Sequence, residues 1–264
     1  SLSVYSAFET FTVFVIIGLY MSLLKKIIKK ILLNNSNFFF SLICSKLYNK
    51  NVSFCYHEIS PNPSRFQKEY NLNVEPKVFS KQIKILKKIF KKNSFLITFD
   101  DGYKGALKNG LKILKKNNIK PIYFICYYCI RNNFPLVSSL VIYLEKNSME
   151  FNSYCLKNNI NKPFFLNINN SQLNLFLKNE KLDKKKVLKY QGNFFKIRDL
   201  KKANSFFIGN HSYKHYNGPA LPDKQFLIDV MQNHRYLRNF KNYVKYFAFT
   251  NGRYDNYKIN VLKK

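Results

Sequence analysis

Acidic side chains are scarce in this sequence. Its 264 residues include 14 Asp and Glu against 45 Lys and Arg, which gives a formal net charge of +31. A charge of this size excludes an acidic surface and favours an anionic partner. The lysines recur along the whole chain and form no single basic stripe with interleaved aromatics, so nucleic acid is the less natural partner. We expect an acidic polymer or an anionic membrane surface instead.

Tryptophan is absent and arginine is rare, whereas Lys, Asn, Ile, Phe and Tyr are all abundant. This combination is typical of A+T-rich coding, so part of the positive charge reflects composition and not a dedicated binding surface. No internal sequence repeat is visible.

Cysteine pairs that could form a disulfide framework are also lacking. The five cysteines are an odd number and lie scattered along the chain. Cys126 and Cys129 have C-x-x-C spacing, but no second pair follows, as a structural zinc site would require. The pair also continues an apolar run that starts at Ile122. We therefore interpret these cysteines as buried thiols.

Near the N-terminus, one apolar stretch is almost long enough to span a membrane. Residues 7–24 are mostly apolar, although a glutamate interrupts them, and the lysine-rich residues 25–30 follow. The positive-inside rule would keep these lysines in the cytoplasm. If translation begins at Met21, a basic amphipathic segment remains for an anionic membrane surface, or the charged front of a signal peptide that ends near Cys44. We treat residues 1–50 as an anchor or leader of a membrane-associated protein.

From residue 51 onward, short apolar runs alternate with helical patterns, which predicts a parallel α/β architecture. The segment at about 131–205 is polar and rich in Asn and Lys, with scattered apolar clusters, and we interpret it as a helical insertion. The expected strands are 52–56, 95–99, 121–125, 205–208 and 246–249, and the expected helices begin near Pro76, Leu107 and Pro222.

Polar residues follow four of these strands. Asp100 and Asp101 end one strand, His57 and His211 each follow another, and the segment 250–252 (Thr-Asn-Gly) follows a fourth. The carboxyl ends of parallel strands meet at one edge of the sheet. This convergence predicts an active site there.

The residue types suit hydrolysis assisted by a metal. Neighbouring carboxylates on an extended backbone point in different directions, so one can bind a divalent metal while the other reaches a water. His211 and His215, at i and i+4, can share a helical face and both ligate the metal. The metal makes a bound water more acidic, and the second carboxylate can take its proton. A plain turn would explain Asp-Asp-Gly alone, but the paired histidines favour a metal site.

Two of these motifs resemble those of a known family. Residues 98–103 (Thr-Phe-Asp-Asp-Gly-Tyr) and 211–215 (His-Ser-Tyr-Lys-His) are similar to the first two motifs of the polysaccharide deacetylases, carbohydrate esterase family 4, also called the NodB-homology domain. Residues 56–59 (Tyr-His-Glu-Ile) resemble the opening segment of many members. The resemblance implies a distorted, incomplete (β/α) barrel over residues 51–264. It also implies removal of acetyl groups from the amino sugars of a polysaccharide or a lipid-linked glycan.

The resemblance also implies roles for individual residues. Asp100 would be the general base. Asp101, His211 and His215 would hold one divalent metal ion, usually zinc.

The third family motif is altered in this chain. Residues 247–252 (Phe-Ala-Phe-Thr-Asn-Gly) place Thr250 where the family has proline and Asn251 where it has an aromatic residue. The family's backbone N–H at the second of these positions helps to bind the oxyanion, so Asn251 could still serve through its backbone. Asn251 and Tyr103 are thus the candidate oxyanion- or substrate-binding residues. The arginine that often precedes this motif has no clear match, and Lys245 is nearest.

The family's late leucine-x-histidine motif, which supplies the general acid, is not found before Lys264. Either the chain is truncated, or it resembles the circularly permuted members that carry the acid histidine on an N-terminal strand. His57 fits the second arrangement, and His234, in the middle of a predicted helix, does not.

Three functions follow. The leading one is a metal-dependent deacetylase. The second is a catalytically degenerate or truncated deacetylase-like domain that binds glycan without turnover. The third, a basic protein that binds a membrane surface or nucleic acid and carries the motifs by chance, is disfavoured by two full motifs in the right order.

Overall fold

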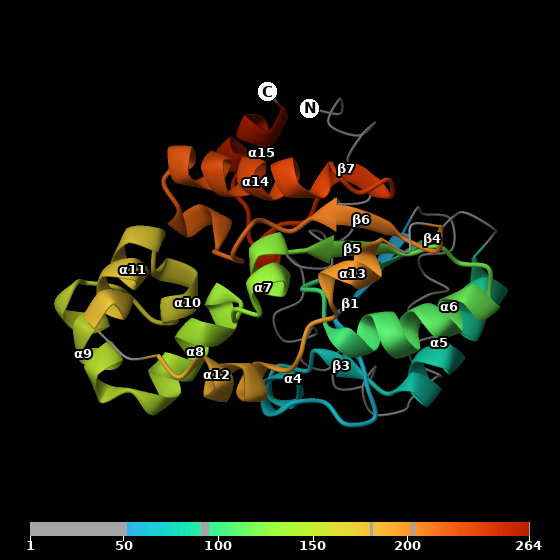
Figure 1. Ribbon diagram of the computed structural model, residues 1–264, viewed down its shortest axis with the longest axis horizontal. Helices are drawn as coiled ribbons and strands as arrows, with labels where there is room; N and C mark the ends of the chain where they lie inside the picture. The colour runs from blue at the N-terminus through green and yellow to red at the C-terminus, as the bar shows by residue number, and fades with distance from the viewer. Residues whose placement is uncertain (1–51, 91–94, 180–181, 202–203, 264) are drawn as a thin grey trace.

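A five-stranded parallel sheet forms the centre of the molecule, as the computed structural model in Figure 1 shows. The structure describes residues 52–90, 95–179, 182–201 and 204–263, so the expected anchor or leader at 1–50 lies outside the described residues. The strands run in the order β1 (Val52–Tyr56), β4 (Phe95–Phe99), β5 (Ile122–Ile125), β6 (Phe207–Asn210) and β7 (Tyr243–Phe247), and every neighbouring pair is parallel. The predicted parallel α/β class is confirmed, and β1 and β7 are the outer strands of the sheet that the described residues form.

Amphipathic helices cover the sheet. Helix α5 (Pro76–Ile89) has proline at its first position, where the missing N–H costs nothing. Its residues Phe79, Ile83 and Leu86 recur at helical spacing and are fully buried in the main core, while its lysines face water. A π-helical turn, η1 (Ala106–Gly110), leads into α6 (Leu111–Lys116), and α14 (Asp223–Leu237) contacts β6.

The register between β1 and β4 decides which side chains share a face. Tyr56 pairs with Phe99, and both rings pack in the main core beside Phe79. The preceding pair, Cys55 and Thr98, must then point to the other face, because side chains alternate along a strand. One residue further on, the Asp100 N–H donates to the Tyr56 carbonyl at 3.0 Å, which extends the ladder past the strand ends.

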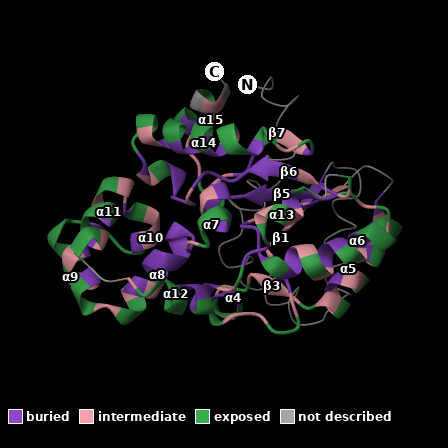
Figure 2. Cartoon of the chain, viewed as in Figure 1, coloured by how far each residue is buried: buried purple, intermediate pink, exposed green. Residues whose placement is uncertain are grey.

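Between β5 and β6, where the sequence predicts a helical insertion, the described residues form helices that lie to one side of the sheet (Figure 1). Its buried side chains form a second core with α14 and β7, in which Phe151 and Phe164 join Phe226, Val230 and Phe247. Figure 2 shows this pattern as buried inner faces and exposed outer faces on the insertion helices. The insertion helices are α7 (Tyr127–Asn132), α8 (Val137–Asn147), α9 (Met149–Lys157), α10 (Phe164–Asn167), α11 (Asn170–Asn179), α12 (Lys184–Gln191) and α13 (Ile197–Leu200).

Three smaller elements complete the description: β2 (Glu58–Ile59) pairs with β3 (Asn73–Val74), α4 (Arg65–Glu69) lies between them, and α15 (Asn256–Lys263) follows the last strand. The expected strand at 246–249 was misplaced, since β7 begins and ends earlier. An irregularity in the β6–β7 ladder, between Ile208 and Asn210, shifts the register, and Ala248 turns to donate its N–H to the Asn210 carbonyl. No helix in the described ranges has both the length and the apolar character to cross a membrane.

Candidate active site

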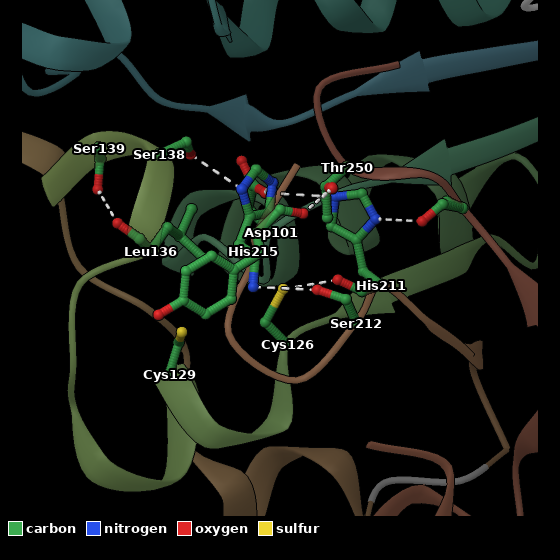
Figure 3. Close-up of polar contacts among 12 residues, drawn as sticks. Asp101, Cys126, Cys129, Leu136, Ser138, Ser139, His211, Ser212, His215 and Thr250 are labelled. Carbon is green, nitrogen blue, oxygen red and sulfur yellow. Dashed lines mark hydrogen bonds and ion pairs between the residues drawn. The ribbon is translucent and has the colours of Figure 1, made fainter. Parts of the chain in front are cut away.

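Asp101, His211 and His215 meet in a cluster that we call the buried cluster. The Asp101 Oδ1 atom lies 3.5 Å from His211 Nε2 and 3.0 Å from His215 Nε2. All three side chains are buried, and Figure 3 shows both imidazoles directed at the carboxylate. Asp101 follows β4 and His211 follows β6, so the sheet brings together the three residues that the sequence proposed as metal ligands.

The expectation that the two histidines share a helical face was wrong. Residues 211–215 form a loop in which Ser212 has φ 65° and His215 has φ 68°, values in the left-handed region that end any helix. The loop is held by its own polar groups: the His215 N–H donates to Ser212 Oγ at 3.0 Å, and the Ser212 N–H donates to Asn210 Oδ1 at 3.0 Å. Asp101 also has a positive φ, of 72°.

Helix α14 braces this loop with two buried polar residues that the sequence analysis missed. The Tyr213 N–H donates to Asp229 Oδ2 at 2.8 Å, and the Asn233 side-chain amide donates to Asn210 Oδ1 at 2.7 Å. Burial raises the pKa of Asp229 to about 6, although the hydrogen bonds from the loop oppose the shift. A signal was available, because Asp229 and Asn233 fall on the buried stripe of α14, where apolar residues are expected.

The partners of each imidazole test whether the buried cluster fits a metal. His211 Nδ1 lies 2.8 Å from the Ala248 carbonyl, and a carbonyl can only accept, so Nδ1 carries the proton of the neutral ring. The Nε2 lone pair then faces the Asp101 carboxylate, and two acceptors at this distance repel unless a cation lies between them. His215 Nδ1 lies 2.9 Å from Ser138 Oγ, which likewise leaves its Nε2 toward Asp101. Two imidazoles, each with an Nδ1 partner outside the cluster, and a carboxylate are a donor set that suits zinc.

The electrostatics of the buried cluster agree with this fit. Burial raises the pKa of Asp101, but the charge of His215 and the contacts with both imidazoles outweigh it and hold that pKa well below its ordinary value. Burial lowers the pKa of His211, but the carboxylates of Asp100 and Asp101 outweigh it and raise that pKa. The site therefore attracts positive charge, as a divalent cation would supply.

Cys55, His57 and Asp100 form a second group, which we call the open cluster. Their ligand-type atoms all lie within 4.8 Å of one another, and each residue is half-buried. The β1–β4 register explains the juxtaposition, since all three lie on one face at neighbouring strand ends. The structure thus brings together the two residues proposed as base and acid. It adds Cys55, which the alternation with His57 along β1 could have indicated.

The third motif is tied to the buried cluster on two sides. The Ala248 carbonyl contacts His211, and the Thr250 hydroxyl donates to the carbonyl of Tyr216, the residue after His215. Thr250 is buried and so anchors the loop without proline. Asn251 lies in the short turn η3 (Thr250–Gly252), has φ 56° and is exposed.

The other residues that the sequence analysis singled out belong to neither cluster, although the Cys126 thiol donates to the His211 carbonyl at 2.9 Å. Tyr103 is fully buried, with its ring stacked on Phe194, so its proposed contact with substrate stays a prediction. His234 Nδ1 lies 2.8 Å from the Tyr243 hydroxyl, at the amino end of β7 and outside both clusters. Cys126 and Cys129 are buried free thiols, as expected.

Comparison with known proteins identifies the fold and the family. The structure of the Streptococcus pyogenes deacetylase PplD in complex with acetate is similar, with a TM-score of 0.50 and 14% sequence identity over 80% of this chain and 78% of that chain. IcaB from Ammonifex degensii gives a TM-score of 0.47 at 14% identity, over the same shares of the two chains. A search of curated protein sequences finds no match.

A model of the polysaccharide deacetylase family matches residues 87–264. The chain belongs to the polysaccharide deacetylase family. Membership supports hydrolytic deacetylation of a polysaccharide as its class of activity.

Proposed function

We propose that this protein is a metal-dependent hydrolase that removes N-acetyl groups from the amino sugars of a polysaccharide or a glycolipid. One observation carries the proposal: in the buried cluster, two imidazole Nε2 atoms both face the Asp101 carboxylate. This arrangement calls for a cation, and the open cluster, with an acid and a base, follows the same strand ends.

Each residue of the site has a distinct task in this proposal. A divalent metal held by Asp101, His211 and His215, most naturally zinc, would supply Lewis acidity toward the acetyl carbonyl and the attacking water. Asp100, whose Oδ1 accepts no hydrogen bond from the described residues, takes the proton of the water. The backbone N–H of Asn251 donates to the developing oxyanion.

The leaving amine needs a proton as the carbon–nitrogen bond breaks. His57 donates that proton, because it is the one histidine in the open cluster and lies beside Asp100. The base and the acid thus sit on adjacent strands, on the same face, where one sugar residue can reach both.

The charge of the chain and its N-terminal sequence suggest where the substrate is met. A formal net charge of +31 favours an anionic surface or polymer over a neutral one. The apolar residues 7–24 followed by lysines support membrane association through the N-terminal segment. A glycan close to an anionic membrane is therefore the substrate we favour.

A glycan-binding domain without turnover is the second candidate. The exposed position of Asn251 and the replacement of the family's proline and aromatic residue favour it. Both candidates could hold the metal, so metal content does not separate them and turnover does.

The test is the release of acetate from N-acetylated amino-sugar oligomers by the purified full chain. The proposal expects release by the zinc-loaded protein, loss of release after chelation, and recovery when zinc is returned. Oligomer binding with no acetate release in any metal-loaded state would establish the second candidate instead. Activity that survives complete removal of the metal would overturn the metal dependence.

A further inference from the structure

Cys55 has no part in the proposed reaction, yet it lies beside the two residues that move protons. The thiol contacts the side chains of Thr98 and Asp100, and Cys55 as a whole residue is half-buried. The other cysteines that the structure describes, Cys126, Cys129 and Cys155, are buried. Cys55 is therefore the least buried cysteine residue in the described part of the chain.

The open cluster has the composition and spacing of a metal site. A thiol, an imidazole and a carboxylate present ligand atoms within 4.8 Å of one another. The Asp100 Oδ1 atom is buried and accepts no hydrogen bond from the described residues, so it can accept a metal bond without breaking an existing contact. The placement is rigid, because the parallel register of β1 and β4 fixes it.

We propose that Cys55, His57 and Asp100 form a second metal site, and that a soft divalent cation bound there inhibits the enzyme. Sulfur, nitrogen and oxygen donors together suit zinc or cadmium, and the sulfur gives this site a preference for soft ions that the buried cluster, which has none, lacks. Three protein ligands leave a coordination position for water, and the half-burial of the site lets a hydrated ion enter.

Inhibition follows from the identity of the ligands. A cation in the open cluster would occupy the carboxylate of Asp100 and a ring nitrogen of His57, so neither could transfer a proton. This consequence rests on the proposed function, whereas binding of the ion does not. Activity would then rise as zinc fills the buried cluster and fall as more zinc fills the open cluster.

Cadmium titration tests binding without any turnover. We expect the full chain to take up a second equivalent of Cd²⁺ and to develop ultraviolet sulfur-to-cadmium absorption. Cys55→Ala should lose that absorption, and Cd²⁺ affinity at this site should fall at least about 100-fold, since even changes around the ligands cost about 10–100-fold. The matched control Cys155→Ala removes a buried thiol from the insertion and should keep the absorption. Cys55→Ser, the milder change, should behave like Cys55→Ala.

His211→Ala separates the two sites. It should lose the equivalent held by the buried cluster and keep the sulfur-to-cadmium absorption. Wild type that shows no such absorption would overturn the proposal, as would absorption that persists undiminished in both Cys55 variants. In unmutated protein, Cd²⁺ should slow alkylation of Cys55, read by mass spectrometry, and unchanged alkylation would also overturn it.

Deacetylation rates measured across a zinc titration test the inhibition. For each protein, the rate in excess zinc is divided by the highest rate that the same protein reaches. For wild type, the ratio of the rate in excess zinc to the peak rate should be small, and for Cys55→Ala it should approach one. An equal ratio in both proteins would refute inhibition at this site. A chain that never releases acetate but shows the Cys55-dependent absorption would refute the proposed function and leave the second metal site standing.

Discussion

The buried cluster and the open cluster hold three residues each and lie at strand ends of one sheet, but they are built in different ways. The open cluster follows the neighbouring strands β1 and β4, whereas the buried cluster follows β4 and β6, which β5 separates. The buried cluster depends on loops: Asp101, Ser212 and His215 adopt left-handed backbone angles, and other side chains hold the loop and its rings. The open cluster depends on strand register alone. Its side chains are half-buried, whereas those of the buried cluster are all buried.

The difference matches two chemical tasks. A metal ligand must be held at a fixed distance and shielded from water, which favours full burial and outside support. A proton-transfer group must meet water and substrate, which favours partial exposure at the mouth of the sheet. The two clusters should therefore respond differently to substitution.

Removal of a ligand from the buried cluster should have the largest effect. His211→Ala should lose the metal and reduce deacetylation by about 10³-fold or more, because the Lewis acid contributes several kcal/mol to the transition state. Metal content and acetate release measure both losses. His234→Ala, which removes a histidine outside both clusters, should keep the metal and the rate. Equal metal content in the two variants would refute the ligand assignment.

Substitution in the open cluster should spare the metal. Asp100→Asn should keep one bound metal in the buried cluster and lower turnover by about 10²–10⁴-fold, the usual contribution of a general base. Metal analysis and initial rates on the same preparation test this. A variant that turns over as fast as wild type would show that Asp100 is not the base.

His57→Ala should likewise keep the metal of the buried cluster, with a loss of about 10²-fold or more in turnover. A general acid must be protonated to act, so the wild-type rate should fall at high pH and this limb should vanish in the variant. The pH–rate profile is the measurement. An unchanged high-pH limb in His57→Ala would assign the acid to another group.

Two buried carboxylates, Asp101 in the buried cluster and Glu58 next to His57, differ in how their charge is balanced. Asp101 is balanced by imidazoles, whereas Glu58 accepts hydrogen bonds from the Ile59 N–H at 2.8 Å and from the Gln67 amide at 3.4 Å. Burial outweighs these bonds and raises the pKa of Glu58 from 4.5 to about 7. Between these two values the folded state binds more protons than the unfolded state, so stability falls as the pH rises through this window.

Because of Glu58, we expect the free energy of unfolding to fall by about 3 kcal/mol as the pH rises across that window. Urea unfolding at a series of pH values should show a shallower fall for Glu58→Gln than for wild type. Glu150→Gln, on the exposed surface of α9, should follow wild type. Identical slopes for all three proteins would contradict the shift.

The smallest effect should come from the residue that supports a ligand without touching the metal. Ser138→Ala removes the partner of His215 Nδ1 and should weaken metal binding by about 10–100-fold. Ser139→Ala is the matched control, since that hydroxyl donates to the Leu136 carbonyl and not to a histidine. Competition with a chelator of known affinity measures both. The same affinity in the two variants would deny Ser138 this role.

The local elements of the fold were largely predictable from the sequence. The strands at 52–56 and 95–99 and the helix beginning at Pro76 follow from apolar periodicity and proline placement, and the structure has them at those bounds. The register between strands was not predictable, because it depends on which helices pack on the sheet. The contact of Cys55 with Asp100 therefore escaped the sequence analysis.

The sequence predicts which residues form the candidate site, but it does not predict the contacts that hold them in place. Aspartates and histidines at strand ends indicate metal chemistry, whereas nothing local links Ser138 to the site. Asp229 gives only one signal, a polar residue on the buried stripe of α14. The loop at 211–215 was mistaken for a helix because i, i+4 spacing does not report the left-handed angles of Ser212 and His215.

The hydrogen bond between Ser138 and His215 would couple the insertion to metal binding. If the metal fixes His215, it also favours the packed position of α8, and whatever favours that position must strengthen metal binding by the same factor. The insertion packs on α14 and β7 through its own core. A ligand that binds its outer surface and favours this packed position would therefore strengthen metal binding without contacting the metal. The insertion would then help to set how tightly the buried cluster holds a metal.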